Sequence, residues 1–355
     1  MTDRTGAVLV TGASSGLGEA TALVLARAGF TVYAGVRSTE AAARIARGHP
    51  GVRPLPLDVT SADSVREACA RVREQTGDAG LRGLVNNAGI CVSAPLECVP
   101  PDELRAELEV NLIGTVTVTQ AFLPLLRVRP PGTPPETPAG RIVNVSSGIG
   151  RVAAPFLGAY AASQFAKEGM SDALRRELAP LSVSVSIVEP GAIMTPIWTK
   201  VAASAHRLLD AAPAERADPY RRGFRGFVAM NERRARESRT RPEAVGHAVR
   251  HAMTARRPRT RYRVGPDAWV ASMAARLLPD RVLDAAIRRQ LASAAAADAG
   301  DTTSVGGTAK AGDTASVGDT VGAGGLAGAA AGSGGPGGPG GPGGPAGRRR
   351  REAGR

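Results

Sequence analysis

The stretch AVLVTGASSGLGEATALVLARAG, residues 7–29, gives the first prediction of the fold. It opens with apolar residues typical of a buried strand and closes with the apolar spacing of a helix. Gly12, Gly16 and Gly18 lie between them and let the backbone turn tightly and approach a pyrophosphate, while the helix that follows offers unpaired N–H groups. Such a spacing alone also fits any tight strand-to-helix turn, so patterns elsewhere in the chain are needed to distinguish the two interpretations.

The remaining chain alternates strand and helix signals in the order that an α/β fold requires. Further strand patterns occur at residues 31–36, 52–57, 81–85, 141–145 and 183–188, and the last short one lies within 259–269. Helical patterns separate them, including residues 61–75, one long helix at 100–126 and a helix that opens near Tyr160. This alternation predicts a Rossmann-type, doubly wound parallel sheet with helices on both faces.

A second stretch, NVSSGIGRVAAPFLGAYAASQFAKEGM at residues 144–170, contains the candidate catalytic residues. Ser147 follows the fifth strand, and Tyr160 stands at the opening of the next helix. A hydroxyl at the carboxyl end of a strand and a phenol on the next helix can converge on one substrate oxygen, which needs a hydrogen-bond donor and an acid/base. Ser147 and Tyr160 are therefore the candidate catalytic pair.

These two stretches, together with NNAG at residues 86–89, resemble the short-chain dehydrogenase/reductase family. The resemblance covers the chain up to about residue 290. It implies that Tyr160 exchanges a proton with the substrate, that Ser147 holds the substrate oxygen, and that Asn111 bends its helix and anchors a relay water. It also implies a homo-oligomer, either a dimer or a tetramer, formed through the helices that contain Asn111 and Tyr160.

One position departs from the family pattern of Tyr-x-x-x-Lys, because Gln164 stands at the place of the Lys. A cation on the next helical turn would favour the phenolate by charge attraction, and Gln cannot supply that charge. Its amide still donates and accepts hydrogen bonds, so Gln164 is expected to hold the nicotinamide ribose. Lys167 lies near the same helical face but roughly 10 Å farther along the axis, and we expect it to be a solvated surface residue.

The resemblance also implies which residues bind a nicotinamide dinucleotide. The strand at 31–36 ends without an acidic residue for the ribose 2′-OH, and Arg37 follows it. A guanidinium there would pair with a 2′-phosphate, so NADP(H) is expected to be preferred and NAD(H) to be possible; a plain surface Arg is the alternative. Besides Arg37, Tyr160 and Gln164, the implied cofactor contacts are Gly12, Ser14, Ser15, Gly16, Leu17, Gly18, Asp58, Val59, Asn87, Ala88, Gly89, Pro190, Gly191, Ile193 and Thr195.

Composition divides the 355 residues into one folded domain and a tail. Residues 1–290 hold the strand and helix signals. Within them, residues 196–240 are expected to form a lid over the substrate crevice, with apolar lining or core packing from Ile197, Trp198, Phe224, Phe227 and Met230. Residues 291–355 are rich in Ala, Gly, Thr and Pro and end in RRRREAGR, so they are expected to be disordered. The Pro-rich residues 129–140 are expected to form a surface loop.

The formal net charge of +13 comes almost entirely from Arg. Residues 205–290 alone hold 20 Arg against 9 Asp plus Glu. A solvated helical surface, an anionic partner and attraction for a phosphorylated ligand all fit this excess. Neither zinc-finger spacing nor an RNA-binding aromatic motif accompanies it, which argues against nucleic acid as the partner.

The Cys and His residues form neither a disulfide pattern nor a metal pattern. Cys69, Cys91 and Cys98 contain no CxxC pair, which suits a reducing cytoplasm. His247 and His251 share a helix face without a third ligand, so no metal site is predicted. No window of ~20 apolar residues occurs, and we expect a soluble, cytoplasmic protein without a membrane span.

The sequence thus favours an oxidoreductase that transfers a hydride between NADP(H) and a secondary alcohol or carbonyl on a hydrophobic small molecule, such as a steroid or retinoid. The C-terminal arrangement resembles the hydroxysteroid and retinol dehydrogenase branch of the family. Because of Gln164, the alternative is a catalytically impaired sensor or scaffold that binds the dinucleotide. A third hypothesis is an anionic-surface binder that uses the Arg-rich region.

Overall fold

A parallel β-sheet forms the centre of the folded unit. The computed structural model describes residues 6–129, 138–195 and 197–304, and within them seven parallel strands follow the order β3-β2-β1-β4-β5-β6-β7. The strands are β1 Ala7–Val10, β2 Thr31–Val36, β3 Val52–Pro56, β4 Gly83–Asn86, β5 Gly140–Val145, β6 Val183–Pro190 and β7 Arg261–Val264. The order reverses between β1 and β4, and in such sheets ligands bind beyond the carboxyl ends of the strands at that point. The predicted doubly wound sheet is confirmed.

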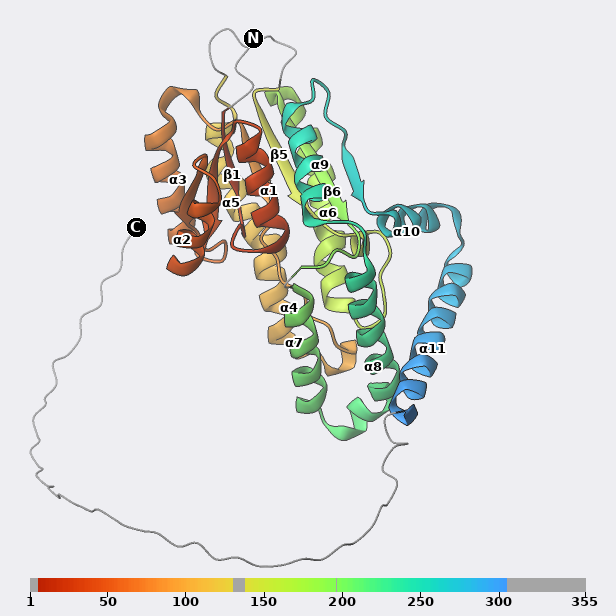
Figure 1. Cartoon of the computed structure of the whole chain (residues 1–355). Helices are drawn as coiled ribbons and strands as arrows, with labels where there is room; N and C mark the ends of the chain where they lie inside the picture. Colours follow the sequence, from red (N-terminus) through yellow and green to blue (C-terminus); the bar gives the residue numbers. More distant parts are fainter. Residues whose placement is uncertain (1–5, 130–137, 196, 305–355) are drawn as a thin grey trace, which may run out of the picture. The chain divides into compact units, whose positions relative to one another are not determined.

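Helices cover both faces of the sheet (Figure 1). On one face, α1 Gly16–Arg27, α2 Thr39–Gly48 and α9 Pro242–Thr254 pack against the sheet; on the other lie α3 Ala62–Thr76, α5 Gly114–Leu126 and α6 Gly158–Leu178. Successive side chains of β1 point to opposite faces of the sheet. Val8 and Val10 pack into the hydrophobic core on the first face, and Leu9 packs into the core on the second. Both faces are therefore apolar, as parallel strands require.

The helix expected at residues 100–126 is interrupted in its middle. It consists of α4 Pro101–Leu108, a π-helical turn at Glu109–Ile113, and α5. By length and composition alone, Pro101–Leu126 could cross a membrane. Val118 and Phe122 of α5, however, are fully buried in the core beneath the sheet. We therefore read this segment as a core helix, and π-helical turns of this kind often lie at functional sites.

The C-terminal third adds helices outside the sheet, namely α7 Ile197–Ala211, α8 Ala214–Glu237, α10 Pro266–Leu277 and α11 Asp280–Ser304. The first compact unit of the chain extends to Gly307. The expected domain end at residue 290 falls inside α11, whose Ala294 is buried. The rest of the predicted tail and most of the Pro-rich loop lie outside the described residues.

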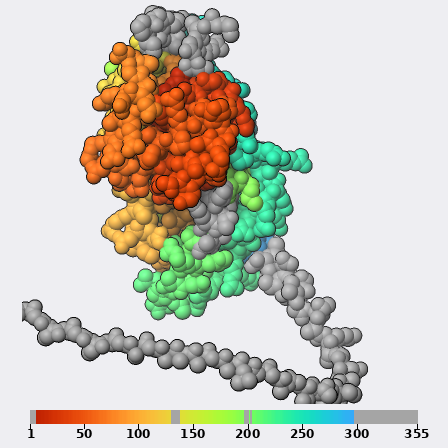
Figure 2. Space-filling view, turned by 60° about the vertical axis from the view of Figure 1, so that its left-hand side comes forward, coloured from red at the N-terminus to blue at the C-terminus, as the bar shows by residue number. Residues whose placement is uncertain are grey.

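Helices α7 and α8 lie within residues 196–240, which the sequence analysis expected to form a lid. In the space-filling view, the green residues of α7 lie on the same face as the red and orange amino-terminal residues (Figure 2). The short helix α2 was not predicted, and β4 begins and ends slightly later than expected.

Candidate active site

The glycine turn after β1 packs directly against the NNAG segment after β4. Gly12 has φ 62°, and a Cβ there would lie 2.7 Å from the Cα of Ala88. A Cβ on Gly18 would lie 2.3 Å from the carbonyl oxygen of Gly12. The hydroxyl of Thr11 accepts hydrogen bonds from the backbone N–H groups of Asn87 and Ala88, both at 3.0 Å. Residues far apart in sequence thus pack together into one compact surface at the carboxyl ends of β1 and β4.

The amino end of α1 leaves its first N–H groups free of a side-chain cap. Ser15, the residue before the helix, makes no capping hydrogen bond. Uncapped N–H groups at a helix N-terminus are an anion site, and they favour a pyrophosphate there. Arg44 on α2 donates to the carbonyl oxygen of Ser14 and pairs with Glu19. Arg44 therefore fixes the turn, a role that the sequence did not indicate because α2 itself was missed.

Arg37 and Asp58 lie together beyond β2 and β3, where the adenosine end of a dinucleotide is expected. Arg37 is exposed directly after β2. The Asp58 carboxylate accepts hydrogen bonds from the N–H and the hydroxyl of Thr60 at 3.0 and 2.7 Å. Burial alone would raise the pKa of Asp58, but these bonds and the charge of Arg37 outweigh it and lower that pKa. A positive and a negative side chain are thus available to a ribose or a phosphate.

Ser147 and Tyr160 meet as predicted. Ser147 follows β5, and its hydroxyl accepts a hydrogen bond from the N–H of Ile149 at 3.2 Å. Tyr160 lies in the first turn of α6. Burial raises the pKa of Tyr160 well above its usual value, nearby Cys91 and Glu107 add to the rise, and a hydrogen bond with Ser147 opposes it. The phenol is therefore protonated at neutral pH, which makes it a proton donor.

Asn111 joins three parts of the site from the π-helical turn. Its Oδ1 accepts from the N–H of Ile90, and its Nδ2 donates to the carbonyl oxygen of Ile90, both at 2.9 Å. The same Nδ2 lies 3.0 Å from the hydroxyl of Ser163 on α6. The amide thus ties the segment after Gly89 to α6, and the helix is irregular at Asn111 as the family resemblance implied.

Gln164 is buried on α6 with only 2% of its surface exposed. Its Nε2 donates to the hydroxyl of Ser163 at 3.2 Å, whereas its Oε1 is buried without a hydrogen-bond partner among the described residues. Buried polar atoms are rarely left unpaired, so a donor from outside the chain is expected there. A ribose hydroxyl meets that need, and with the glycine turn it makes the site fit a nicotinamide dinucleotide.

The expectation that Lys167 is a solvated surface residue is wrong. Only 1% of its surface is exposed, and its Nζ donates to the carbonyl oxygen of Val145 at 3.2 Å. Burial lowers the pKa of Lys167 to about 8, while the neighbouring Glu168 opposes the shift. Its ammonium is thus bound to the end of β5.

The segment after β6 is anchored at the edge of the site. β6 ends at Pro190, and the N–H of Gly191 donates to the carbonyl oxygen of Val264 at 2.9 Å. The N–H of Ala192 donates to the carboxylate of Asp267 on α10 at 2.5 Å. Ile193 is buried in the core beside α1 and α9. Asp267 therefore holds the predicted nicotinamide segment, although no motif in the sequence pointed to it.

Aromatic residues close the site on the lid side. Phe224 and Phe227 of α8 are buried, and their ring centroids lie 5.2 and 5.4 Å from that of Phe156. Phe156 has φ 67°, a strained conformation for a residue with a side chain. Tyr160, Cys91, Ile149 and Met230 pack against the same cluster. The side chains of Ile197 and Trp198 lie outside the described residues.

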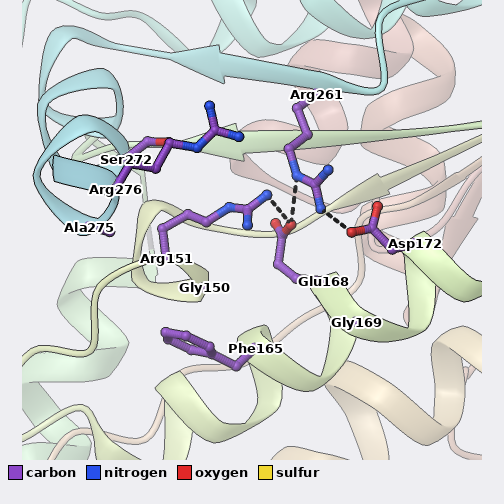
Figure 3. A pocket seen from close by; sticks show the side chains of 10 residues that line it. All are labelled: Gly150, Arg151, Phe165, Glu168, Gly169, Asp172, Arg261, Ser272, Ala275 and Arg276. Carbon is purple, nitrogen blue, oxygen red and sulfur yellow. Dashed lines mark hydrogen bonds and ion pairs between the residues drawn. The ribbon is translucent and has the colours of Figure 1, made fainter.

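A separate cavity of about 370 Å³ lies between α6, β7 and α10 (Figure 3). Arg151 and Arg261 both pair with Glu168, at 3.0 and 3.2 Å, and Arg261 also pairs with Asp172 at 2.7 Å. Burial raises the pKa of Glu168 to about 7, and Glu189 contributes to the rise. None of the predicted site residues lines this cavity. The network therefore holds the sheet edge to α6 outside the candidate active site.

Comparison with known proteins agrees with this geometry. A family model for short chain dehydrogenases matches residues 6–206. The chain is 38% identical over 277 residues to a 3-amino-tetrahydro-pyrrolizinone reductase from Xenorhabdus hominickii, covering 78% of this chain and 93% of that protein. It is 37% identical over 290 residues to Retinol dehydrogenase 5 from Mus musculus, covering 79% and 87%.

Among solved structures, a short chain dehydrogenase from Burkholderia cenocepacia in complex with NADP is 28% identical. It superimposes with a TM-score of 0.58 and covers 80% of this chain and 96% of its own. The structure places the glycine turn before α1, brings Ser147 and Tyr160 together after β5, and interrupts the helix at Asn111. The chain therefore belongs to the short-chain dehydrogenase/reductase family and is an NAD(P)-dependent oxidoreductase with relatives in its retinol dehydrogenase branch.

Proposed function

We propose that the chain uses NADPH to reduce a carbonyl group on a hydrophobic small molecule to a secondary alcohol. The observation that carries this proposal is the contact between Ser147 and a protonated Tyr160 at the end of β5. Two hydroxyl donors on one substrate oxygen suit a carbonyl that becomes an alkoxide, because both stabilise the developing negative charge. The aromatic cluster around Phe156 supports a hydrophobic substrate.

The chain's own residues have distinct parts in this reaction. When bound, the nicotinamide supplies the hydride. Ser147 holds the substrate oxygen, and Tyr160 gives that oxygen its proton. Gln164 is proposed to accept a hydrogen bond from the ribose through its unpaired Oε1. Reduction needs the protonated phenol, which is the form that the raised pKa of Tyr160 maintains at neutral pH.

The preference for NADP(H) over NAD(H) is supported by Arg37, whose guanidinium is exposed directly after β2. A fixed positive charge there favours a 2′-phosphate. The preference predicts that Arg37→Ala weakens NADPH binding about tenfold or more and leaves NADH binding nearly unchanged. Isothermal calorimetry with both dinucleotides measures this difference.

Turnover is tested by following NADPH consumption with a panel of lipophilic ketones and aldehydes, comparing wild type with Tyr160→Phe. The variant should lose at least a hundredfold in kcat, because the proton donor is gone while the ring remains. Equal inactivity of both proteins across the panel, with NADPH bound, would refute the reductase.

A dinucleotide-binding sensor without catalysis is the second candidate function. Gln164 favours it, because the described part of the site places no ammonium group beside Tyr160. Gln164→Lys distinguishes the two functions. A large gain in turnover supports an impaired enzyme, whereas unchanged inactivity with intact NADPH binding supports the sensor.

A further inference from the structure

Glu107 is a buried acid beside the active site that the mechanism above leaves without a part. It lies on α4, one helical turn before Asn111, and 0% of its surface is exposed. Its Oε1 accepts from Nδ2 of Asn111 and its Oε2 from the N–H of Val92, each at 3.3 Å. No Lys or Arg among the described residues forms an ion pair with it. A carboxyl group in this position has hydrogen bonds but no counter-charge.

Glu107 and Asn111 together hold the short segment that follows NNAG. Asn111 binds both the N–H and the carbonyl oxygen of Ile90, and Glu107 binds the N–H of Val92. Cys91 is therefore fixed from both sides. It packs against the same apolar cluster as Tyr160, and the two groups interact electrostatically. These hydrogen bonds hold the segment in place and thus keep Cys91 and Glu107 close to the phenol of Tyr160.

The titratable groups that face Glu107 are all acids. Glu103 lies one turn earlier on α4, Cys91 belongs to the segment after β4, and Tyr160 comes from α6. Glu103 is itself paired with Arg207 on α7 at 2.8 Å. At the family's Lys position stands the neutral Gln164. In the part of the chain that the structure describes, no cation compensates a negative charge on Glu107, and that charge raises the pKa of Tyr160.

We propose that Glu107 is a positioning residue that sets the pH range in which Tyr160 can donate its proton. As a neutral acid, it leaves the phenol free to release its proton to the substrate oxygen while the carbonyl carbon gains the hydride lost by the reduced nicotinamide. As a carboxylate, it opposes the phenolate that this release creates. The phenolate then recovers a proton from solvent. This inference rests on the proposed reductase function.

The ionisation of Glu107 falls within an accessible pH range. Burial raises the pKa of Glu107 to about 8, partly opposed by the hydrogen bonds from Val92 and Asn111, and Glu103 adds to the rise. The wild type should therefore lose about tenfold in kcat/KM for carbonyl reduction between pH 7 and pH 9. In Glu107→Gln the midpoint of this alkaline loss in kcat/KM should move up by at least about one pH unit.

Two further variants separate the effect of the Glu107 charge from effects of the substitution on the structure. Glu103→Gln removes a carboxylate one turn away that adds to the rise in the pKa of Glu107, so this variant should keep the alkaline loss and move its midpoint slightly down, opposite to Glu107→Gln. Glu107→Asp keeps the carboxyl group and should keep an alkaline loss. If circular dichroism shows that Glu107→Gln does not fold, Glu107→Met fills a similar volume without a charge and takes its place.

A second measurement needs no turnover. The infrared C=O band of a protonated carboxyl group, taken as the difference between wild type and Glu107→Gln, should be present at pH 7. It should vanish with the same midpoint as the alkaline loss of activity. A missing band at pH 7, or a pH profile that Glu107→Gln leaves unmoved, overturns the inference alone. A wild type without turnover on any carbonyl overturns the proposed function and this inference with it.

Discussion

At the residue scale, the fold buries charged groups that lack a full set of partners. Lys167 is the clearest case, since its ammonium has the Val145 carbonyl as its one hydrogen-bond partner among the described residues. Water would solvate that charge better than one carbonyl can. The folded protein therefore binds the proton of Lys167 less tightly than the unfolded chain does.

This difference predicts how Lys167 affects stability. The pKa of Lys167 is about 8 in the folded state against 10.5 unfolded. Below pH 8, Lys167 is charged in both the folded and the unfolded state, so the folded state bears the full cost of burying the charge. Between pH 8 and 10.5 the unfolded state holds more protons on Lys167 than the folded state does, so the free energy of unfolding rises with pH. Lys167→Met should raise the free energy of unfolding at pH 7 by about 1–3 kcal/mol and remove that rise. Urea denaturation at pH 7 and pH 10 measures both effects.

A variant that is less stable than wild type at pH 7 would show that the bond from Lys167 to Val145 outweighs the cost of burial. Arg175→Met offers a control on the same helix, because Arg175 is partly exposed and pairs with Asp172. Exposed pairs contribute little, so this change should leave the free energy of unfolding within about 0.5 kcal/mol.

At the element scale, the contact between α8 and α11 depends on small side chains. A Cβ on Gly226 would lie 2.8 Å from backbone atoms of Ala295, whereas one on Gly223, a turn earlier on α8, would meet only the Phe156 ring at 3.8 Å. Gly226→Ala should therefore lower the free energy of unfolding by about 1–3 kcal/mol. Gly223→Ala should raise it by about 0.5–1 kcal/mol through helix propensity. Thermal and urea unfolding of the two variants, which carry the same chemical change, compare these effects directly.

The sequence predicted elements well where local pattern and core packing agree, and less well elsewhere. β2 was placed at its observed bounds because its apolar run is continuous. Helix α2 was missed because Ile45 is its one large apolar residue and the one residue of that helix that is buried, although Ser38 caps it through a hydrogen bond from Ala41. Residues 291–304 were assigned to the tail because of their Ala-rich composition, whereas in α11 small side chains are what close packing on Gly226 requires.

The same contrast holds in the active site. Gly12, Ser147 and Tyr160 lie in motifs with fixed spacing, so the sequence located them. Glu107, Lys167 and Asp267 each bind a backbone group from another segment of the chain, and no local pattern records those contacts. The π-helical turn at Asn111 was implied only by family resemblance, because the apolar pattern runs through it without a break.

At the scale of the whole molecule, α11 belongs to the folded unit. Leu291 packs on the aromatic cluster that also contacts Tyr160, and Ala294 is buried against α8. A chain that ends after Ser304 should therefore unfold with the free energy of the full-length protein. A chain that ends after Gln290 should lose about 2 kcal/mol or more, because burial of Leu291 and its neighbours is lost.

Urea denaturation of the two truncated chains, with the full-length protein alongside, tests this boundary. The shorter chain should also bind hydrophobic carbonyl substrates more weakly while its affinity for NADPH stays the same, since α11 supports α8 and not the glycine turn. Equal stability of the two truncated chains would place the end of the folded unit at residue 290, as composition alone had indicated. A parallel loss of NADPH affinity would mean that α11 supports the sheet as well as the lid.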